Sequence, residues 1–130
     1  MAKNTKATTR KKTVYAVPKG KIYVQATFNN TIISVTDTKG NVISWASAGA
    51  NNFKGARKST PYAAQITLKS ALDKAKAYGL ESVDVFVTGV GQGREAAVRA
   101  IQGTGIMISG IKDLTPVPHN GTRPKKPRRV

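Results

Sequence analysis

The chain has 130 residues, 39% of them hydrophobic, and 22 Lys and Arg against six Asp and Glu give it a formal net charge of +16. This length fits one domain with a hydrophobic core, and the self-repulsion of so many positive charges favours a polyanion, namely nucleic acid, as the partner. The absence of cysteine excludes disulfides and thiolate metal sites, and one histidine, His119, cannot form a metal-binding cluster. No segment has the length and apolarity of a membrane span or signal peptide, so the sequence predicts a cytoplasmic protein.

The positive charge is concentrated at the two ends of the chain. Residues 1–21 contain seven Lys and Arg and residues 119–130 contain five, with no acidic residue in either segment. Residues 22–118 contain ten basic and six acidic residues, which is ordinary for a soluble domain. We therefore expect a basic N-terminal extension (1–21) that becomes ordered on its partner, a folded domain (22–118) and a basic C-terminal tail (119–130).

The first half of the folded domain shows the pattern of three strands. Apolar and polar residues alternate over 22–28, and β-rich runs follow at 31–37 and 42–47. Asn29-Asn30 and the segment TKGN supply the turns between them. Such short connections imply an antiparallel meander.

The segment STPYAAQITLKSALDKAKAYG predicts a helix. Ser59 or Thr60 can act as the N-cap, Pro61 suits the first helical position, and Gly79 suits the C-terminal cap. Alanines and leucines at helical spacing give it one apolar face.

The remaining domain predicts a strand at 82–88, a second helix from Arg94 to about Gln102, and a last strand at 106–114. The order βββαβαβ indicates one α/β domain with a mixed five-stranded sheet and helices on its faces.

The glycine-rich segment GVGQGRE lies between a predicted strand and a predicted helix, where backbone amides can hold a phosphate. Its spacing, Gly89-x-Gly91-x-Gly93, differs from the GxGxxG of dinucleotide-binding proteins. Three interpretations remain open: contact with an RNA phosphate, nucleotide binding, and a tight turn without a ligand.

The segment FKGARKST places Lys54, Arg57 and Lys58 just before the first predicted helix, and Gly55 lets another backbone approach. Ser59 or Thr60 amides at the helix start would add to phosphate binding, so this segment is a candidate RNA contact. The alternative is a flexible, solvated connector.

Two further groups of residues have a functional and a structural interpretation. Asn29, Asn30 and Thr31 form a hairpin turn whose amides could contact sugars or base edges. Arg94 and Arg99 lie a little over one helical turn apart, so both could face a nucleic-acid backbone; otherwise they belong to an ordinary exposed helix face.

The sequence shows no catalytic arrangement. His119 has no partnered nucleophile or acid, the acidic residues show no paired spacing, and neither a cofactor nor a metal site is expected. The aromatic residues are not interleaved with basic ones as a base-stacking platform would require, so we expect most of them in the core or at its edge. They include Tyr15, Tyr23, Trp45, Tyr62 and Tyr78.

The C-terminal tail is built to stay extended, because four prolines between Pro116 and Pro127 prevent a helix. Its basic side chains can then follow a groove of phosphates, and Asn120-Gly121 is a turn dipeptide. The alternative is a tail that acts as nonspecific electrostatic glue.

Four motifs, FNNTI, FKGARKSTPYAAQ, GQGRE and TPVPHNGTRPKKPRRV, resemble the ribosomal protein S11 family of the small subunit, in its bacterial or organellar form. The similarity runs from about Lys21 to Val130. It implies a non-enzymatic protein that binds ribosomal RNA in the subunit platform, beside the exit-site messenger RNA path, with neighbours similar to proteins S7, S18 and S21. It also implies a three-layer fold of the ribonuclease-H-like type and a location on the ribosome, in the cytoplasm or an organelle.

On the family pattern the RNA-facing positions are Asn29, Asn30, Lys54, Gly55, Arg57, Lys58, Ser59, Gly91, Gly93, Arg94, His119, Asn120, Gly121 and Arg123. Charge and position in the chain add Arg10, Lys11, Lys12, Thr31, Gln92, Arg99, Lys125, Lys126, Arg128 and Arg129 as candidate RNA-binding residues. The sequence departs from the family at Val90 and Gln92, where prolines are usual, so we expect a less rigid loop.

Two rival functions follow from single features of the sequence. The GVGQG segment alone would suit a nucleotide-using enzyme, and the charge alone would suit a nonspecific, nucleoid-type nucleic-acid-binding protein. Free nucleotide binding would favour the first, and indifference between duplex DNA and folded RNA would favour the second.

Overall fold

A computed structural model describes residues 15–129, so the predicted contacts of Arg10, Lys11 and Lys12 lie outside the described residues. The strands are β1 (Lys19–Ala26), β2 (Thr31–Asp37), β3 (Val42–Ser47), β4 (Ser82–Thr88) and β5 (Met107–Asp113). The helices are α1 (Pro61–Ala75) and α2 (Gly93–Gln102), with single 3₁₀ turns η1 (Gly49–Asn51), η2 (Gly55–Ser59) and η3 (Lys76–Tyr78).

The five strands form one mixed sheet in the order β3-β2-β1-β4-β5. β1, β2 and β3 are an antiparallel meander, whereas β4 lies parallel to β1 and β5 lies parallel to β4. The predicted α/β class, mixed sheet and element order are confirmed. As a result, β1, β3, β4 and β5 all run in the same direction.

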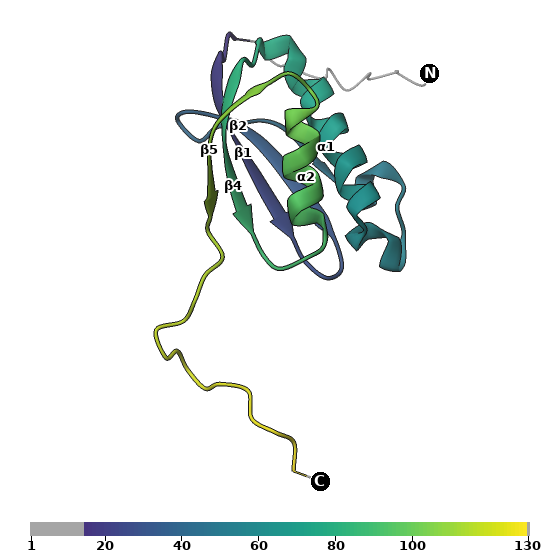
Figure 1. Cartoon of the computed structure of the whole chain (residues 1–130), viewed down its shortest axis with the longest axis vertical. Helices are drawn as coiled ribbons and strands as arrows, with labels where there is room; N and C mark the ends of the chain where they lie inside the picture. The colour runs from purple at the N-terminus through teal and green to yellow at the C-terminus, as the bar shows by residue number, and fades with distance from the viewer. Residues whose placement is uncertain (1–14, 130) are drawn as a thin grey trace, which may run out of the picture.

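The number of layers differs from the three that were expected. Both helices lie on one face of the sheet and pack against each other, α1 over β2 and β3 and α2 over β1, β4 and β5 (Figure 1). The connections from β3 to β4 and from β4 to β5 advance across the sheet in the same direction, and right-handed crossovers then place both helices on the same face. Within residues 15–129 the fold therefore has two layers, with the second sheet face uncovered.

The first strand begins earlier and ends earlier than the alternation over 22–28 predicts. β1 starts at Lys19, and the chain before it already packs on the domain: Val17 is buried and its amide donates to the Tyr78 carbonyl at 2.8 Å. The Tyr15 hydroxyl donates to Asp37 Oδ2 at 2.8 Å. Residues 15–21 thus belong to the body rather than to an extension, and Phe28 lies in the turn after β1 with 72% of its surface exposed.

The ends of α1 agree with the sequence. Of the two candidate N-caps, Thr60 is the one that acts, since its hydroxyl oxygen accepts from the Ala63 amide at 3.2 Å and Pro61 follows it. At the other end the chain passes through η3 to Gly79, whose φ of +69° is the left-handed conformation of a helix C-cap. The buried face of α1, including Leu68 and Leu72, packs on the sheet.

Candidate nucleic-acid interface

Most of the described candidate residues come together at one end of the domain, which we call the loop end. Because β1, β3, β4 and β5 run in the same direction, the segments that follow them leave the sheet at the same end: residues 27–30, 48–60, 89–92 and 114–129. Both helices also begin there (Figure 1). Ligands of α/β sheets typically bind beyond the carboxyl ends of the strands, so this is where an interface is expected.

The turn between β1 and β2 is held by its own side chains. The Thr27 hydroxyl oxygen accepts from the amides of Asn29 and Asn30 at 3.3 and 3.0 Å, and Asn30 Oδ1 accepts from the Thr31 amide at 2.9 Å. The Asn29 side chain is exposed, whereas Thr31 is fully buried and its Oγ1 has no hydrogen-bond partner among the described residues. Thr31 therefore supports the turn from below, and its side chain does not reach a ligand at the surface.

Residues 89–93, the glycine loop, press directly on the end of β1. A Cβ on Gly89 would collide with the Ala26 carbonyl and a Cβ on Gly91 with the Thr27 carbonyl, while one on Gly93 would lie 2.6 Å from Thr31 Oγ1. The Gly91 amide is already used, because it donates to the Ala26 carbonyl at 3.0 Å. Close packing thus accounts for these glycines, and Gln92 is the exposed candidate of the loop.

Residues 53–60, the basic segment, lie beside the start of α1. Lys54, Gly55 and Arg57 are exposed, and Lys58 and Ser59 are half-buried. The Phe53 and Tyr62 rings meet edge to face at 6.0 Å and so tie the segment to the first turn of α1. Within residues 15–129 the ion pairs involve other cations, so the charges of the basic segment are available to a polyanion.

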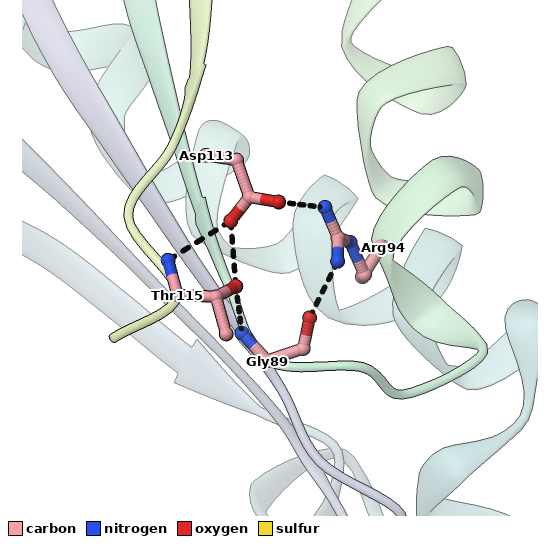
Figure 2. Close-up of polar contacts among 4 residues, drawn as sticks. All are labelled: Gly89, Arg94, Asp113 and Thr115. Carbon is pink, nitrogen blue, oxygen red and sulfur yellow. Dashed lines mark hydrogen bonds and ion pairs between the residues drawn. The ribbon is translucent and has the colours of Figure 1, made fainter. Parts of the chain in front are cut away.

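Arg94 belongs to a closed set of polar contacts at the root of the tail (Figure 2). Its guanidinium donates to the Gly89 carbonyl at 2.8 Å and to Asp113 Oδ2 at 2.7 Å. Thr115 donates to Asp113 Oδ1 from its amide at 2.9 Å and from its hydroxyl at 2.5 Å, and the hydroxyl oxygen accepts from the Gly89 amide at 3.1 Å. We call these four residues the Arg94–Asp113 cluster.

The Arg94–Asp113 cluster changes the interpretation of Arg94. Hydrogen bonds from Thr115 and from the Arg94 guanidinium lower the pKa of Asp113 to about 2. The Arg94 charge is therefore paired with a carboxylate at 2.7 Å. Arg99 is less engaged, because it is exposed and its guanidinium lies 3.9 Å from Glu95 Oε2. Sequence reasoning did not single out Asp113 and Thr115, because no local motif links them to residues 89–94.

The tail leaves β5 at the loop end and runs away from the body (Figure 1). His119, Gly121 and the five basic residues beyond it are exposed, and Asn120 has a φ of +75°, which agrees with the predicted turn. These basic residues are Arg123, Lys125, Lys126, Arg128 and Arg129.

The acidic residues lie mostly away from the loop end. Asp37 ends β2 and Glu81 precedes β4, both at the opposite end of the sheet. At the loop end itself the acids are Glu95 and Asp113, and the latter is paired with Arg94. The loop end therefore presents a net positive surface even before the tail is counted.

The geometry does not resemble a nucleotide site. A cavity of about 590 Å³ lies at the other end of the molecule, lined by Leu72, Leu80 and Ile106 together with charged side chains, and no residue of the glycine loop lines it. In the part of the chain that the structure describes, no three metal-ligating side chains gather as a metal site would need. None of the described helices has the length and apolarity to span a membrane.

Comparison with known proteins identifies the family. Residues 20–129 match the family described as Ribosomal protein S11. The chain is 53% identical over 130 residues to the small ribosomal subunit protein uS11 of Borreliella burgdorferi, covering all of both chains. It is 54% identical over 125 residues to uS11 of Nitratidesulfovibrio vulgaris, covering 96% of this chain and 97% of that one. The chain therefore belongs to the ribosomal protein S11 family and is a structural ribosomal protein, not an enzyme.

Proposed function

We propose that this protein is a structural constituent of the small ribosomal subunit that binds ribosomal RNA through its loop end and its basic tail. The observation that carries the proposal is the meeting of three loops and the tail at one positively charged end of the domain. The candidate RNA-binding residues with exposed side chains are Asn29, Lys54, Arg57, Gln92 and Arg99, together with those of the tail between His119 and Arg129.

The family supports a finer placement within the subunit. By its resemblance to S11 the protein would lie in the platform beside the exit-site messenger RNA path, with neighbours similar to S7, S18 and S21. It would then act on the ribosome of a bacterial cytoplasm or of an organelle. The body would fix the orientation of the loops, and the tail would pass between RNA helices.

The alternative function is nonspecific binding of nucleic acid. The +16 charge favours it, because phosphate neutralisation alone gives affinity without sequence preference. A small-subunit RNA fragment that outcompetes duplex DNA would support the ribosomal function, because folded RNA is recognised by its shape and its 2′-hydroxyls. Equal competition by duplex DNA would support the alternative.

The salt dependence of binding tests the proposed interface. If about ten phosphates are engaged, the logarithm of the affinity for small-subunit RNA falls against the logarithm of salt concentration with a slope of about −7 to −9. Replacing Lys54, Arg57 and Lys58 together by alanine reduces the magnitude of this slope by about 2 to 3, since each lost phosphate contact contributes about 0.7 to 0.9.

The matched control removes the same charge from another surface. Lys39, Lys69 and Lys76 are exposed and lie outside the loop end, so their triple replacement by alanine leaves the slope close to that of the wild type. Filter binding or fluorescence anisotropy across a salt series measures both variants. Equal changes in the two triple variants would mean that net charge, rather than the loop end, determines RNA binding.

A further inference from the structure

The sheet face opposite the helices carries a row of side chains that crosses all five strands. Residues paired across neighbouring strands point to the same face. From β5 to β3 the paired residues are Lys112, Phe86, Tyr23, Ser34 and Trp45. They alternate along β1, β2 and β4 with buried residues that face α1 and α2, so the row faces away from the helices. The prediction that most of the aromatic residues lie in the core or at its edge fails for Trp45 and Tyr62, which are 54% and 62% exposed.

Two aromatic groups in this row flank a gap one strand wide. The Tyr23 and Phe86 rings stack with centroids 5.1 Å apart and planes 18° apart. Trp45 lies two strands from Tyr23, a separation of about 9 to 10 Å at the usual strand spacing. Only the small side chain of Ser34 lies between them. We call this gap the aromatic slot; at this backbone spacing a planar group midway between Tyr23 and Trp45 would lie about 4.5 to 5 Å from each flanking strand, within the range at which ring centroids stack.

Two lysine side chains lie close to aromatic rings of this row. Lys21 Nζ lies 5.8 Å from the centroid of the Phe86 ring. Lys74 extends from α1 around the edge strand β3, where its Nζ lies 5.7 Å from the Trp45 ring centroid and 3.3 Å from the Trp45 carbonyl oxygen. With Lys19 and Lys112 these lysines outnumber the one acidic residue of this sheet face, Asp84.

We propose that the aromatic slot binds one unpaired RNA nucleobase between Tyr23 and Trp45, while the nearby lysines contact the adjoining phosphates. A polyanion matches the excess of lysine, and every base has a planar face that can stack on an aromatic ring. An apolar protein helix would gain nothing from those cations. The inference rests on the proposed RNA-binding function and adds a surface that is separate from the loop end.

Trp45 provides the measurement, because it is the single tryptophan of the chain. The full-length protein is titrated with single-stranded oligoadenylate and, separately, with an abasic oligonucleotide of the same length. Oligoadenylate is expected to quench the Trp45 emission through base stacking. The abasic strand carries the same phosphates without bases and is expected to leave the emission nearly unchanged.

Two variants test the walls and the floor of the aromatic slot. Tyr23→Leu removes one stacking surface, and Ser34→Leu fills the gap while keeping both aromatic residues. Each is expected to weaken oligoadenylate binding about 5- to 150-fold, the effect of losing one stacked base. The matched control is Gln25→Leu, an exposed position on the same strand and face but outside the row, which keeps wild-type binding. Thermal unfolding confirms that each variant is folded.

The outcomes separate this inference from the proposed function. Equal quenching by the abasic strand, or wild-type binding in both slot variants, overturns the inference. The two slot variants could also bind oligoadenylate as the wild type does and yet be incorporated poorly into small subunits. That result would mean that this face docks a protein, and it would overturn the inference. If the wild-type protein shows no salt-dependent binding to folded small-subunit RNA, the proposed function is overturned instead.

Discussion

The carboxylate of Asp113 helps to join two parts of the chain that are distant in sequence, residues 89–94 and residues 113–115. It accepts hydrogen bonds from Arg94 on α2 and from Thr115 at the start of the tail, and Thr115 in turn contacts Gly89. These contacts fix the direction in which the tail leaves β5. Arg94, which the sequence suggested as an RNA contact, thus acts in this structure by holding the root of the tail.

The pKa of Asp113 gives a pH-dependent prediction. The native pKa, about 2, lies below the ordinary value of 3.8, so the native state favours the ionised carboxylate. The stability it contributes is fully present above about pH 4 and is lost as the pH falls through about 2. NMR titration of the Asp113 side chain should show this low pKa, and Thr115→Val should raise it toward 3.8 by removing the hydroxyl donor. A wild-type Asp113 that titrates near 3.8 would contradict the cluster.

A second carboxylate has its pKa lowered at the opposite end of the molecule. The Tyr15 hydroxyl, followed by the Asn41 and Lys39 donors, lowers the pKa of Asp37 despite its partial burial. The same hydrogen bond raises the pKa of Tyr15. The loss of stability of the whole protein in acid therefore contains contributions from both carboxylates. Residue-specific titration is needed to assign a pKa to Asp37 or to Asp113.

The glycine loop shows how an element can look like a phosphate-binding motif for a structural reason. Its glycines let the start of α2 lie against the end of β1 and the turn that follows, with no room for a Cβ at Gly89 or Gly91. The amides of both residues are also engaged, Gly89 with Thr115 and Gly91 with Ala26. Of the three interpretations, the geometry favours a tight turn that positions Gln92 and the tail.

Replacing Gly91 by alanine tests this packing. The new Cβ would press on the Thr27 carbonyl, so we expect the free energy of unfolding to fall by about 1 to 3 kcal/mol, as for other overpacked sites. The control is Gly103→Ala at the end of α2, where the backbone is right-handed helical and the nearest atom to a new Cβ is 3.5 Å away. Its unfolding free energy should change by no more than about 0.5 kcal/mol. Urea unfolding measures both, and equal stabilities would contradict the proposed role of the glycine.

The molecule consists of a folded body and an exposed, positively charged tail. Residues 119–129, the described part of the tail, are exposed and make none of the core contacts that hold the sheet to the helices. The body, by contrast, is held by a continuous core and by one mixed sheet. The tail is therefore expected to contribute to RNA affinity without contributing to the stability of the fold.

Deleting residues 119–130 tests that division. Five basic residues are lost, so the salt dependence of binding to small-subunit RNA should become shallower by about 3.5 to 4.5 in slope. The melting temperature of the free protein should stay close to that of the full chain, because no core residue is removed. A large fall in melting temperature, or an unchanged slope, would show that the tail serves the fold rather than the RNA.

Local sequence patterns predicted most of the elements and supplied most of the candidate interface residues. The bounds of β2, β3 and β4 match the predicted runs, because β-rich segments between turn residues are a local signal. The Thr60-Pro61 start of α1 and the left-handed Gly79 after it are equally local. The basic segment and the tail could likewise be recognised from charge and proline content alone.

Which residues meet depends on the tertiary structure. The placement of both helices on one sheet face, the burial of Thr31 and the pairing of Arg94 with Asp113 depend on strand order and register, which join residues far apart in the chain. The row from Lys112 to Trp45 is the clearest case, since its members come from five separate strands. Local composition does not predict such pairings, because they form only when the strands assemble and the core excludes water.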